Sequence, residues 1–197
     1  MITVLHDLSR QALAALRVLL VMTVLLGVLY PATVWAVGRV VPDRADGSLV
    51  EVDGRPVGSA LLGQAVDGPG WFHGRPSAAE YDGLASAPSN LGPSNPDLLA
   101  AIEQRRAEVA SREGVDPADV PPDALTASGS GLDPHVSPAY AALQVPRVAR
   151  ERDLPVSLVR RLVDDATSGR ALGFLGEPTV DVLTLNVAVE RAAQGAD

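Results

Sequence analysis

The longest hydrophobic stretch of the chain lies near its N-terminus and carries no charge. Between Arg17 and Arg39, the only ionisable side chain in the segment 18–38 is that of a tyrosine. A helix of this length spans about 31 Å, which matches a bilayer hydrocarbon core of about 30 Å. We therefore predict one transmembrane helix over residues 17–38, after a short tail over residues 1–16.

The same residues also fit a cleaved secretory signal. Arg10 and Arg17 would form its basic region, Val18–Leu29 its apolar region, and Pro31 is well placed to end it before a cleavage site at Ala36. The alternative to an anchored protein is therefore a secreted binding protein or serine hydrolase released after Ala36.

After a polar tether over residues 39–56, the pattern predicts one soluble domain over residues 57–197. Apolar residues over 57–66 are typical of a strand, and residues 67–95 are dense in Gly, Pro, Ser and Asn, as in a long loop. A further short strand is predicted over Leu125–Ser128.

Helix signals dominate the second half of the domain. Ser94 or Asn95 is a suitable N-cap for a helix that begins at Pro96 and ends at Gly114. Two further helices begin at Ser137-Pro138, with a bend or break at Pro146, and at Pro155. The segment 180–189 fits either a strand or a helix capped by Asp181. The fold class is thus α+β, a mixed domain rich in loops.

Composition excludes several kinds of chemistry. All sixteen basic residues are arginine, and the chain has no cysteine, so it lacks a Walker A lysine, a thiol nucleophile and thiolate metal ligands. Residues 39–197 hold fourteen arginines and twenty-three carboxylates, a net charge of −9. A domain this acidic is a poor binder of nucleic acid, which is recognised largely by neutralising phosphates.

Candidate chemistry gathers in the segment 126–137. Ser128, Ser130, Asp133 and His135 bring hydroxyls, a carboxylate and an imidazole close together in sequence, as a serine hydrolase requires. However, neither serine has the glycine two positions earlier that a nucleophile elbow needs. A structured loop that docks a partner is the preferred interpretation.

Two weaker patterns also concern binding. His73 and Arg75 are suited either to holding an anion or to lying as exposed polar side chains on a turn. Within the span, Thr23, Gly27 and Pro31 recur every four residues, and small residues on one helix face allow a second helix to approach closely in lipid. No segment has metal-ligand or phosphate-loop spacing.

Taken together, the loop motifs resemble a known family, the C subunit of the bacterial Kdp potassium-transporting P-type ATPase. The resemblance covers nearly the whole chain. Its motifs are Tyr30-Pro31, Gly58-Ser59, Leu62-Gly63-Gln64, Phe72–Ala78, Ser89–Pro96, Thr126–Ser137, Gln144, Arg147-Val148-Ala149, Val182-Leu183 and Leu185-Asn186.

The resemblance implies a non-catalytic accessory subunit of an ATP-driven potassium uptake complex. Its implied partners are an ATP-hydrolysing subunit and a potassium-channel-like subunit in the cell membrane. It further implies a catalytic chaperone that raises the ATP affinity of the hydrolysing subunit, with ATP and potassium handled by the complex and no cofactor bound by this chain alone. The site residues expected to dock partners are Thr23, Gly27, Pro31, Ser128, Ser130, Asp133 and His135.

The side of the membrane that holds the domain is indicated only weakly. Two arginines precede the span and two follow it closely, so the positive-inside rule nearly ties. The short leading tail and the long acidic domain favour an N-terminus inside and residues 40–197 outside the cytoplasm.

Overall fold

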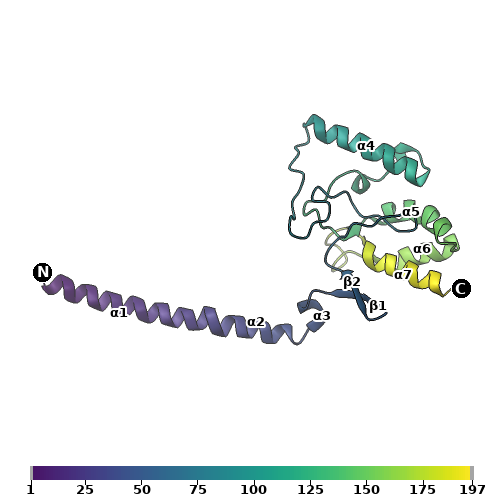
Figure 1. Cartoon of the computed structure of the whole chain (residues 1–197). Coiled ribbons are helices and arrows are strands. Elements are labelled where there is room, and N and C mark those ends of the chain that lie inside the picture. Colours follow the sequence, from purple (N-terminus) through teal and green to yellow (C-terminus); the bar gives the residue numbers. More distant parts are fainter. Residues whose placement is uncertain (1, 196–197) are drawn as a thin grey trace. The chain divides into compact units, whose positions relative to one another are not determined.

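The N-terminal part of the computed structural model, which describes residues 2–195, is one long helical stretch (Figure 1). It consists of α1 (Ile2–Val24), a π-helical segment η1 (Leu25–Leu29) and α2 (Tyr30–Gly38). Residues His6–Gly38 form a helix of 33 residues, in which the most apolar stretch of 18 residues has a mean hydropathy of 2.5, so it is long and apolar enough to cross a membrane. The helix thus extends into residues expected as a tail, because the leucines and alanines there are strong helix formers.

Pro31 is accommodated by the change of helix type just before it. A proline has no N–H to donate, and its ring clashes with the carbonyl of the fourth residue before it. In η1 the Tyr30 N–H bonds to the Leu25 carbonyl, five residues back, which widens the helix at this point. The Thr33 hydroxyl donates to the Leu29 carbonyl at 2.8 Å, so a side chain satisfies a backbone group near the proline.

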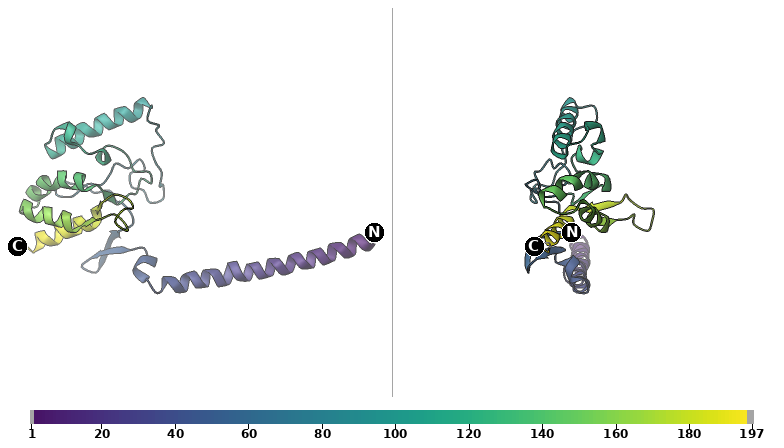
Figure 2. Two further views of the ribbon diagram at one scale, coloured as in Figure 1. Left: turned by 180° about the vertical axis from the view of Figure 1, so that it is seen from behind. Right: turned by 90° about the vertical axis from the view of Figure 1, so that its right-hand side faces the viewer.

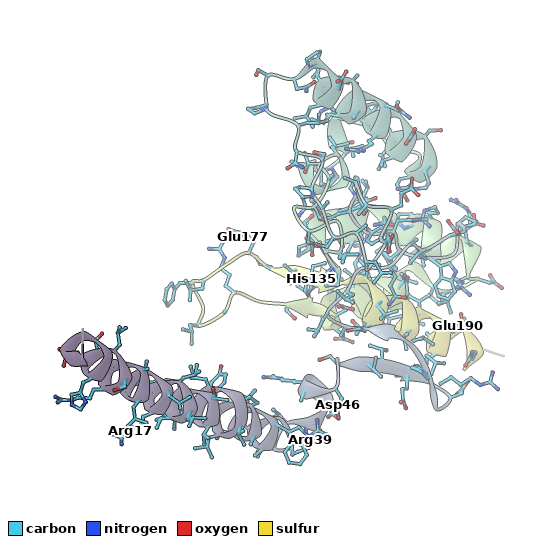
Figure 3. The ribbon with its side chains drawn as sticks, turned by 60° about the vertical axis from the view of Figure 1, so that its left-hand side comes forward. Arg17, Arg39, Asp46, His135, Glu177 and Glu190 are labelled. Atoms are coloured by element: carbon cyan, nitrogen blue, oxygen red, sulfur yellow. The ribbon has the colours of Figure 1, made fainter. Side chains whose placement is uncertain are left out.

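The predicted tether over 39–56 contains regular structure. The short helix α3 (Pro42–Ala45) lies within it, and Arg39 and Asp46 on either side of α3 form an ion pair at 2.6 Å (Figure 3). The chain divides into compact units at residues 48 and 49, and each unit is described by itself.

The second unit begins with an antiparallel hairpin of β1 (Leu49–Val52) and β2 (Arg55–Ser59), which has a bulge between Val50 and Glu51. The strand predicted over 57–66 is therefore wrong in its bounds, since β2 lies earlier and ends at Ser59. The reason is that a positive φ at Asp53 and Gly54 closes a tight turn that the hydrophobic pattern alone did not indicate. Residues 67–95 contain no helix or strand, as predicted.

The helices agree closely with the sequence. The N-caps of α4 (Pro96–Glu113) and α5 (Pro138–Glu151) are Asn95 and Ser137, and Gly114 ends α4 in a left-handed conformation. Pro146 does not interrupt α5, because the Ala142 carbonyl that loses its donor lies on the exposed side of the helix.

The segment 180–189, for which the sequence left strand and helix open, begins as a strand and continues as a helix. Helix α6 (Val156–Asp165) leads into β4 (Thr167–Ser168), and β5 (Thr179–Asp181) leads into α7 (Val182–Gln194). Asp181 ends the strand and caps α7 by accepting the Thr184 N–H at 2.7 Å.

A small antiparallel sheet links distant parts of the domain, in the order β3-β5-β4, where β3 is His135–Val136. The short strand predicted over Leu125–Ser128 is wrong, since the strand in this region lies ten residues later. Two 3-10 turns, η2 (Pro117–Asp119) and η3 (Pro122–Ala124), occupy the segment before it, where prolines prevent ladder pairing.

Helices α4, α5, α6 and α7 follow one another across the domain in Figures 1 and 2. Their facing sides and the central strand β5 enclose the core, since each helix carries one apolar stripe. The largest fully buried side chains are those of Tyr140, Phe72, Leu185, Gln144, Val145, Val148, Val159, Val180 and Val189.

Candidate functional site

Three loop segments that are distant in sequence form one layer, which we call the loop surface: residues 59–64, 74–88 and 126–137. The Gly63 N–H donates to the Leu132 carbonyl at 2.8 Å, and the Ser128 N–H donates to the Pro76 carbonyl at 3.0 Å. The Ser77 hydroxyl donates to the Gly131 carbonyl at 2.7 Å. The segments therefore hold one another mainly through backbone groups, which the numerous small residues leave accessible.

Two glycines of the loop surface have no room for a side chain. A Cβ at Gly63 would overlap the carbonyl oxygen of Asp133. Gly131 has φ +71°, and a Cβ there would come within 2.9 Å of the Ala87 carbonyl oxygen. Glycine is required at these positions by close approach and, at Gly131, by the left-handed backbone.

The carboxylate of Asp133 is used to shape the loop. One oxygen accepts the His135 N–H at 3.0 Å, and the other pairs with Arg75 at 3.1 Å. The His135 Nδ1 lies 3.6 Å from the carboxylate, longer than a hydrogen bond. The arrangement is an Asx turn closed by an ion pair and differs from the Asp–His contact of a hydrolase.

The two serines differ in exposure. Ser128 is 3% exposed, and its Oγ has no hydrogen-bond partner among residues 2–195, so it is not activated by a base within the described chain. Ser130 is exposed, and its Oγ accepts the Leu132 N–H at 3.0 Å. Of the residues predicted in this loop, Ser130 and the half-buried Asp133 and His135 are accessible to a partner.

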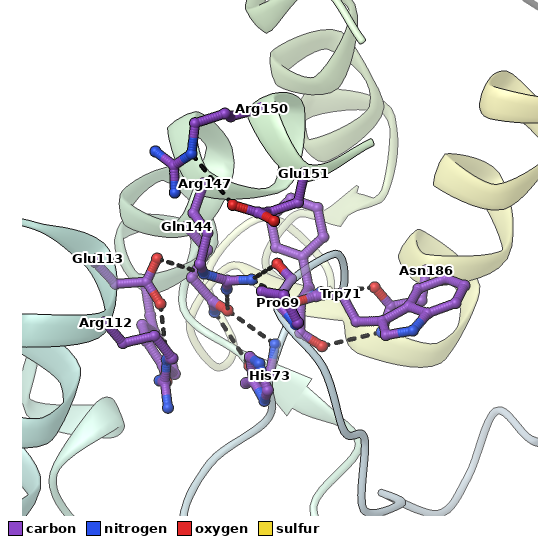
Figure 4. A network of polar contacts seen from close by, with 12 residues as sticks. Pro69, Trp71, His73, Arg112, Glu113, Gln144, Arg147, Arg150, Glu151 and Asn186 are labelled. Atoms are coloured by element: carbon purple, nitrogen blue, oxygen red, sulfur yellow. Dashed lines mark hydrogen bonds and ion pairs between the residues drawn. The ribbon is translucent and has the colours of Figure 1, made fainter. Parts of the chain in front are cut away.

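Beneath the loop surface, two amide side chains hold the irregular segment 69–73 (Figure 4). Asn186 of α7 bonds to both the N–H and the carbonyl of Phe72, at 2.8 and 2.9 Å. Gln144 of α5 does the same for His73, at 2.8 and 3.1 Å. Each amide thus pairs both backbone groups of a residue that belongs to no helix or strand, and this explains why polar side chains are buried at 144 and 186.

A buried ion pair completes this polar network. Arg147 is 2% exposed and pairs at 2.9 Å with Glu113, whose side chain is fully buried. The guanidinium also donates to the Gln144 side chain and to the carbonyls of Pro69 and Trp71. Because the charge is both paired and hydrogen-bonded, its desolvation is compensated.

Arg152 holds the same segment from the end of α5. Its guanidinium lies 3.6 Å from the ring centroid of Trp71, donates to the Gly70 carbonyl at 2.9 Å, and pairs with Glu190 of α7 at 3.0 Å. A cation stacked on an indole ring in this way fixes both the ring and the backbone beside it.

His73 lies at the edge of this network and is neutral at pH 7. Burial of the ring, helped by the nearby charges of Arg112 and Arg147, lowers the pKa of His73 to about 4. Its Nε2 is buried with no hydrogen-bond partner among residues 2–195.

A cavity of about 390 Å³ opens beside His73. Three arginines line it together with three carboxylates, so no sign of charge dominates. Arg75, which the sequence suggested for anion binding, is engaged by Asp133 and by the Thr126 carbonyl. The charged residues of the lining are Asp67, Arg75, Glu80, Arg105, Glu108 and Arg112.

Comparison with known proteins identifies the family. Residues 12–191 match the family model described as "K+-transporting ATPase, c chain" (KdpC). The chain belongs to the KdpC family. A curated relative from Kineococcus radiotolerans, named potassium-transporting ATPase KdpC subunit, is 60% identical over 191 residues, which are 96% of this chain and 97% of the relative.

Further KdpC relatives cover nearly as much of the chain. The KdpC subunit of Mycobacterium tuberculosis is 49% identical over 187 residues, 92% of this chain and 98% of the relative. That of Methylococcus capsulatus is 51% identical over 180 residues, 89% of this chain and 95% of the relative. The resemblance read from the loop motifs is therefore confirmed, and the chain is an accessory subunit of a potassium-transporting ATPase.

Within residues 2–195, no group of three or more His, Asp or Glu side chains is placed to hold an ion. ATP and potassium are handled by the complex, and no site for either was expected in this chain alone.

Of the three residues predicted to share one face of the span, two are neighbours on the helix. Thr23 and Gly27 are neighbours on the helix surface, since a Cβ at Gly27 would lie 3.9 Å from the Thr23 methyl group. Pro31 follows the π-helical segment, which changes the rotation along the helix. The role of these residues against a partner helix stays a prediction.

Glu113 and the segment 169–176 were not among the residues predicted from the sequence. No local signal marks Glu113, because its partner Arg147 lies thirty-four positions away. The second segment has a visible signal, a run of apolar residues bounded by Arg170 and Glu177.

Proposed function

We propose that this chain is a membrane-anchored subunit without catalytic activity of its own, which docks its loop surface on the other subunits of the potassium transporter. The observation that carries the proposal is the loop surface itself. Three distant segments are tied together there by backbone hydrogen bonds over a buried polar network. An arrangement this rigid suits recognition, since a preordered surface loses little entropy on binding.

The loop surface is tested by adding bulk without disturbing its internal contacts. Gly129 is exposed and has open space around a Cβ, so Gly129→Arg should fold normally and obstruct docking. We expect the amount of potassium-transporter subunits that co-purify in mild detergent to fall at least about tenfold. The matched control is Ser157→Arg, which adds the same side chain at an exposed position of α6. Equal co-purification of both variants would contradict the proposal.

The span is proposed to contribute through Thr23, Gly27 and Pro31. Gly27→Leu keeps the segment apolar but adds a side chain next to Thr23, so close approach of a partner helix is lost while insertion is kept. Co-purification should fall, with membrane-bound protein unchanged. The control Val28→Leu alters a side chain that already exists on the same stretch.

The domain is proposed to lie outside the cytoplasm. Because the chain has no cysteine, a single Ser157→Cys at an exposed position of α6, outside the loop surface, gives an unambiguous labelling site. We expect a membrane-impermeant thiol reagent to label this variant in intact cells. Labelling only after cell lysis would place the domain in the cytoplasm.

The family resemblance supports a further role in raising the ATP affinity of the ATP-hydrolysing subunit. An outside domain is separated from cytoplasmic ATP by about 30 Å of hydrocarbon, so its influence would pass through the span by favouring one conformation of the partner. Gly27→Leu is then expected to raise the KM for ATP of the assembled complex. An unchanged KM in a complex that contains the variant would argue against transmission through this face.

A further inference from the structure

The connection between β4 and β5 carries large apolar side chains that the domain does not cover. Leu172 is 84% exposed, Phe174 is 68% exposed and Leu175 is 50% exposed. We call residues 169–176 the apolar finger. It projects from the rest of the domain in the right-hand view of Figure 2 and in Figure 3, where Glu177 at its base is labelled.

The apolar finger has a defined shape. Ala171 and Leu175 exchange both backbone hydrogen bonds, each at 2.9 Å. Arg170 and Glu177 form an ion pair at 2.6 Å across the base. Below them β5 is the central strand of the sheet, with Val180 fully buried. The exposed side chains are therefore presented from a hydrogen-bonded hairpin anchored in the core.

The backbone at the tip adds a second, independent observation. Leu172 has φ +54° and is followed by Gly173 at φ +82°. A left-handed turn position favours glycine or asparagine, and a leucine there is strained as well as exposed to water. Both features oppose the stability of the isolated domain, and strained residues of this kind cluster at functional sites.

We propose that the apolar finger inserts into an apolar cleft on another protein subunit of the potassium transporter, an inference that rests on the proposed function. Leu172 and Phe174 are the anchors, and the paired Arg170 and Glu177 form a polar rim around them. An apolar centre inside a polar rim is the usual construction of a protein interface.

A lipid surface fits the same segment less well. Interfacial anchors combine apolar side chains with tryptophan or tyrosine and with unpaired cations that attract anionic lipid. The apolar finger has no tryptophan and no tyrosine, and its one arginine is neutralised by Glu177. Residues 49–197 as a whole hold twelve arginines and twenty-one carboxylates. The negative domain is repelled by an anionic bilayer, whereas a shaped cleft makes use of the fixed hairpin.

The first experiment measures assembly of the full-length chain with the transporter. Asparagine accepts the left-handed backbone conformation at position 172, so Leu172→Asn retains the hairpin and removes the apolar anchor. Co-purified subunits should decrease about tenfold, as for loss of an interface hot spot. The control is Leu99→Asn, which removes an exposed leucine from α4. Equal co-purification of both variants would overturn the proposal.

A second experiment separates protein from lipid as the occupant. Leu172→Cys, in a chain without other cysteines, carries a fluorophore that shifts to the blue in apolar surroundings. The emission of the probe should be shifted to the blue in the assembled transporter. It should not be shifted when the full chain alone is placed in vesicles of phosphatidylethanolamine and phosphatidylglycerol. A shift in the vesicles alone would assign the finger to the membrane, and no shift in either sample would show it free. Both results overturn the proposal.

Failure of this inference is distinguishable from failure of the proposed function. If the unmodified chain retains no transporter subunit, the proposed function fails. If Gly129→Arg weakens assembly and Leu172→Asn does not, only the apolar finger is excluded.

Discussion

The polar network around Arg147 and the apolar finger around Leu172 invert the ordinary distribution of side chains in opposite ways. The network buries a charge pair and two amides, and each of them has its hydrogen-bond partners within the chain. The finger exposes large apolar side chains that the chain leaves uncovered. The first arrangement holds the segment 69–73 in place and serves the fold, whereas the second weakens the isolated domain. Mutations in the two regions should therefore affect stability and assembly very differently.

The largest effect on stability is expected at the centre of the network. Arg147→Met leaves the fully buried Glu113 with Arg112 as its remaining partner and removes the donors to the Pro69 and Trp71 carbonyls. It should lower the free energy of unfolding by about 3 kcal/mol. Urea unfolding of the purified chain in detergent measures the loss. Arg150→Met, three residues away at an exposed ion pair of the same helix, should change it by less than about 1 kcal/mol. Similar losses for both variants would mean that the buried pair is not special.

A smaller loss is expected where a buried amide pairs with irregular backbone. Asn186→Leu keeps the volume but leaves the buried N–H of Phe72 without an acceptor, which should destabilise the domain by about 2 kcal/mol. The exposed Gln104→Leu on α4 is the control. Limited proteolysis should also cut near Trp71 in the first variant and not in the second.

The network should also make stability depend on pH through His73. Its pKa is about 4 in the folded chain and about 6.5 when unfolded, so only the unfolded chain takes up this proton between these values. The contribution of the neutral His73 to the free energy of unfolding is fully present above pH 6.5 and is lost as the pH decreases toward 4. The loss is about 2 kcal/mol once solvent screening of the half-buried ring is allowed for. Urea unfolding at pH 7 and pH 4.5 should show this loss in the wild type and a smaller loss in His73→Gln. Parallel loss in both chains would remove His73 as the cause.

The smallest effect, and the only one of opposite sign, is expected at the finger. Leu172→Asn relieves a left-handed leucine and should raise the free energy of unfolding by up to about 1 kcal/mol. Thermal unfolding of the isolated chain measures the change. A clear destabilisation would mean that the finger belongs to the fold, and the contrast between the two regions would disappear.

Much of the helical structure was predictable because its determinants are local. Asn95, Ser137 and Asp181 cap helices a few residues away, and Gly114 ends one. Likewise, the apolar span is evident from the uncharged run after Arg17, and the helix that contains it begins earlier because the preceding residues also favour helix.

The apolar span, the helices, the family and the absence of thiol and lysine chemistry were all predictable, since each depends on residue type or on neighbours within a few positions. The hairpin register, the sheet order β3-β5-β4, the polar network and the exposure of the apolar finger depend on how distant parts of the chain pack, so they appear only in the folded structure. Phe72 bonds to Asn186 across 114 positions, and Arg147 pairs with Glu113 across 34. No periodicity records such pairings, because they arise only when the folded chain brings distant groups together and removes them from water.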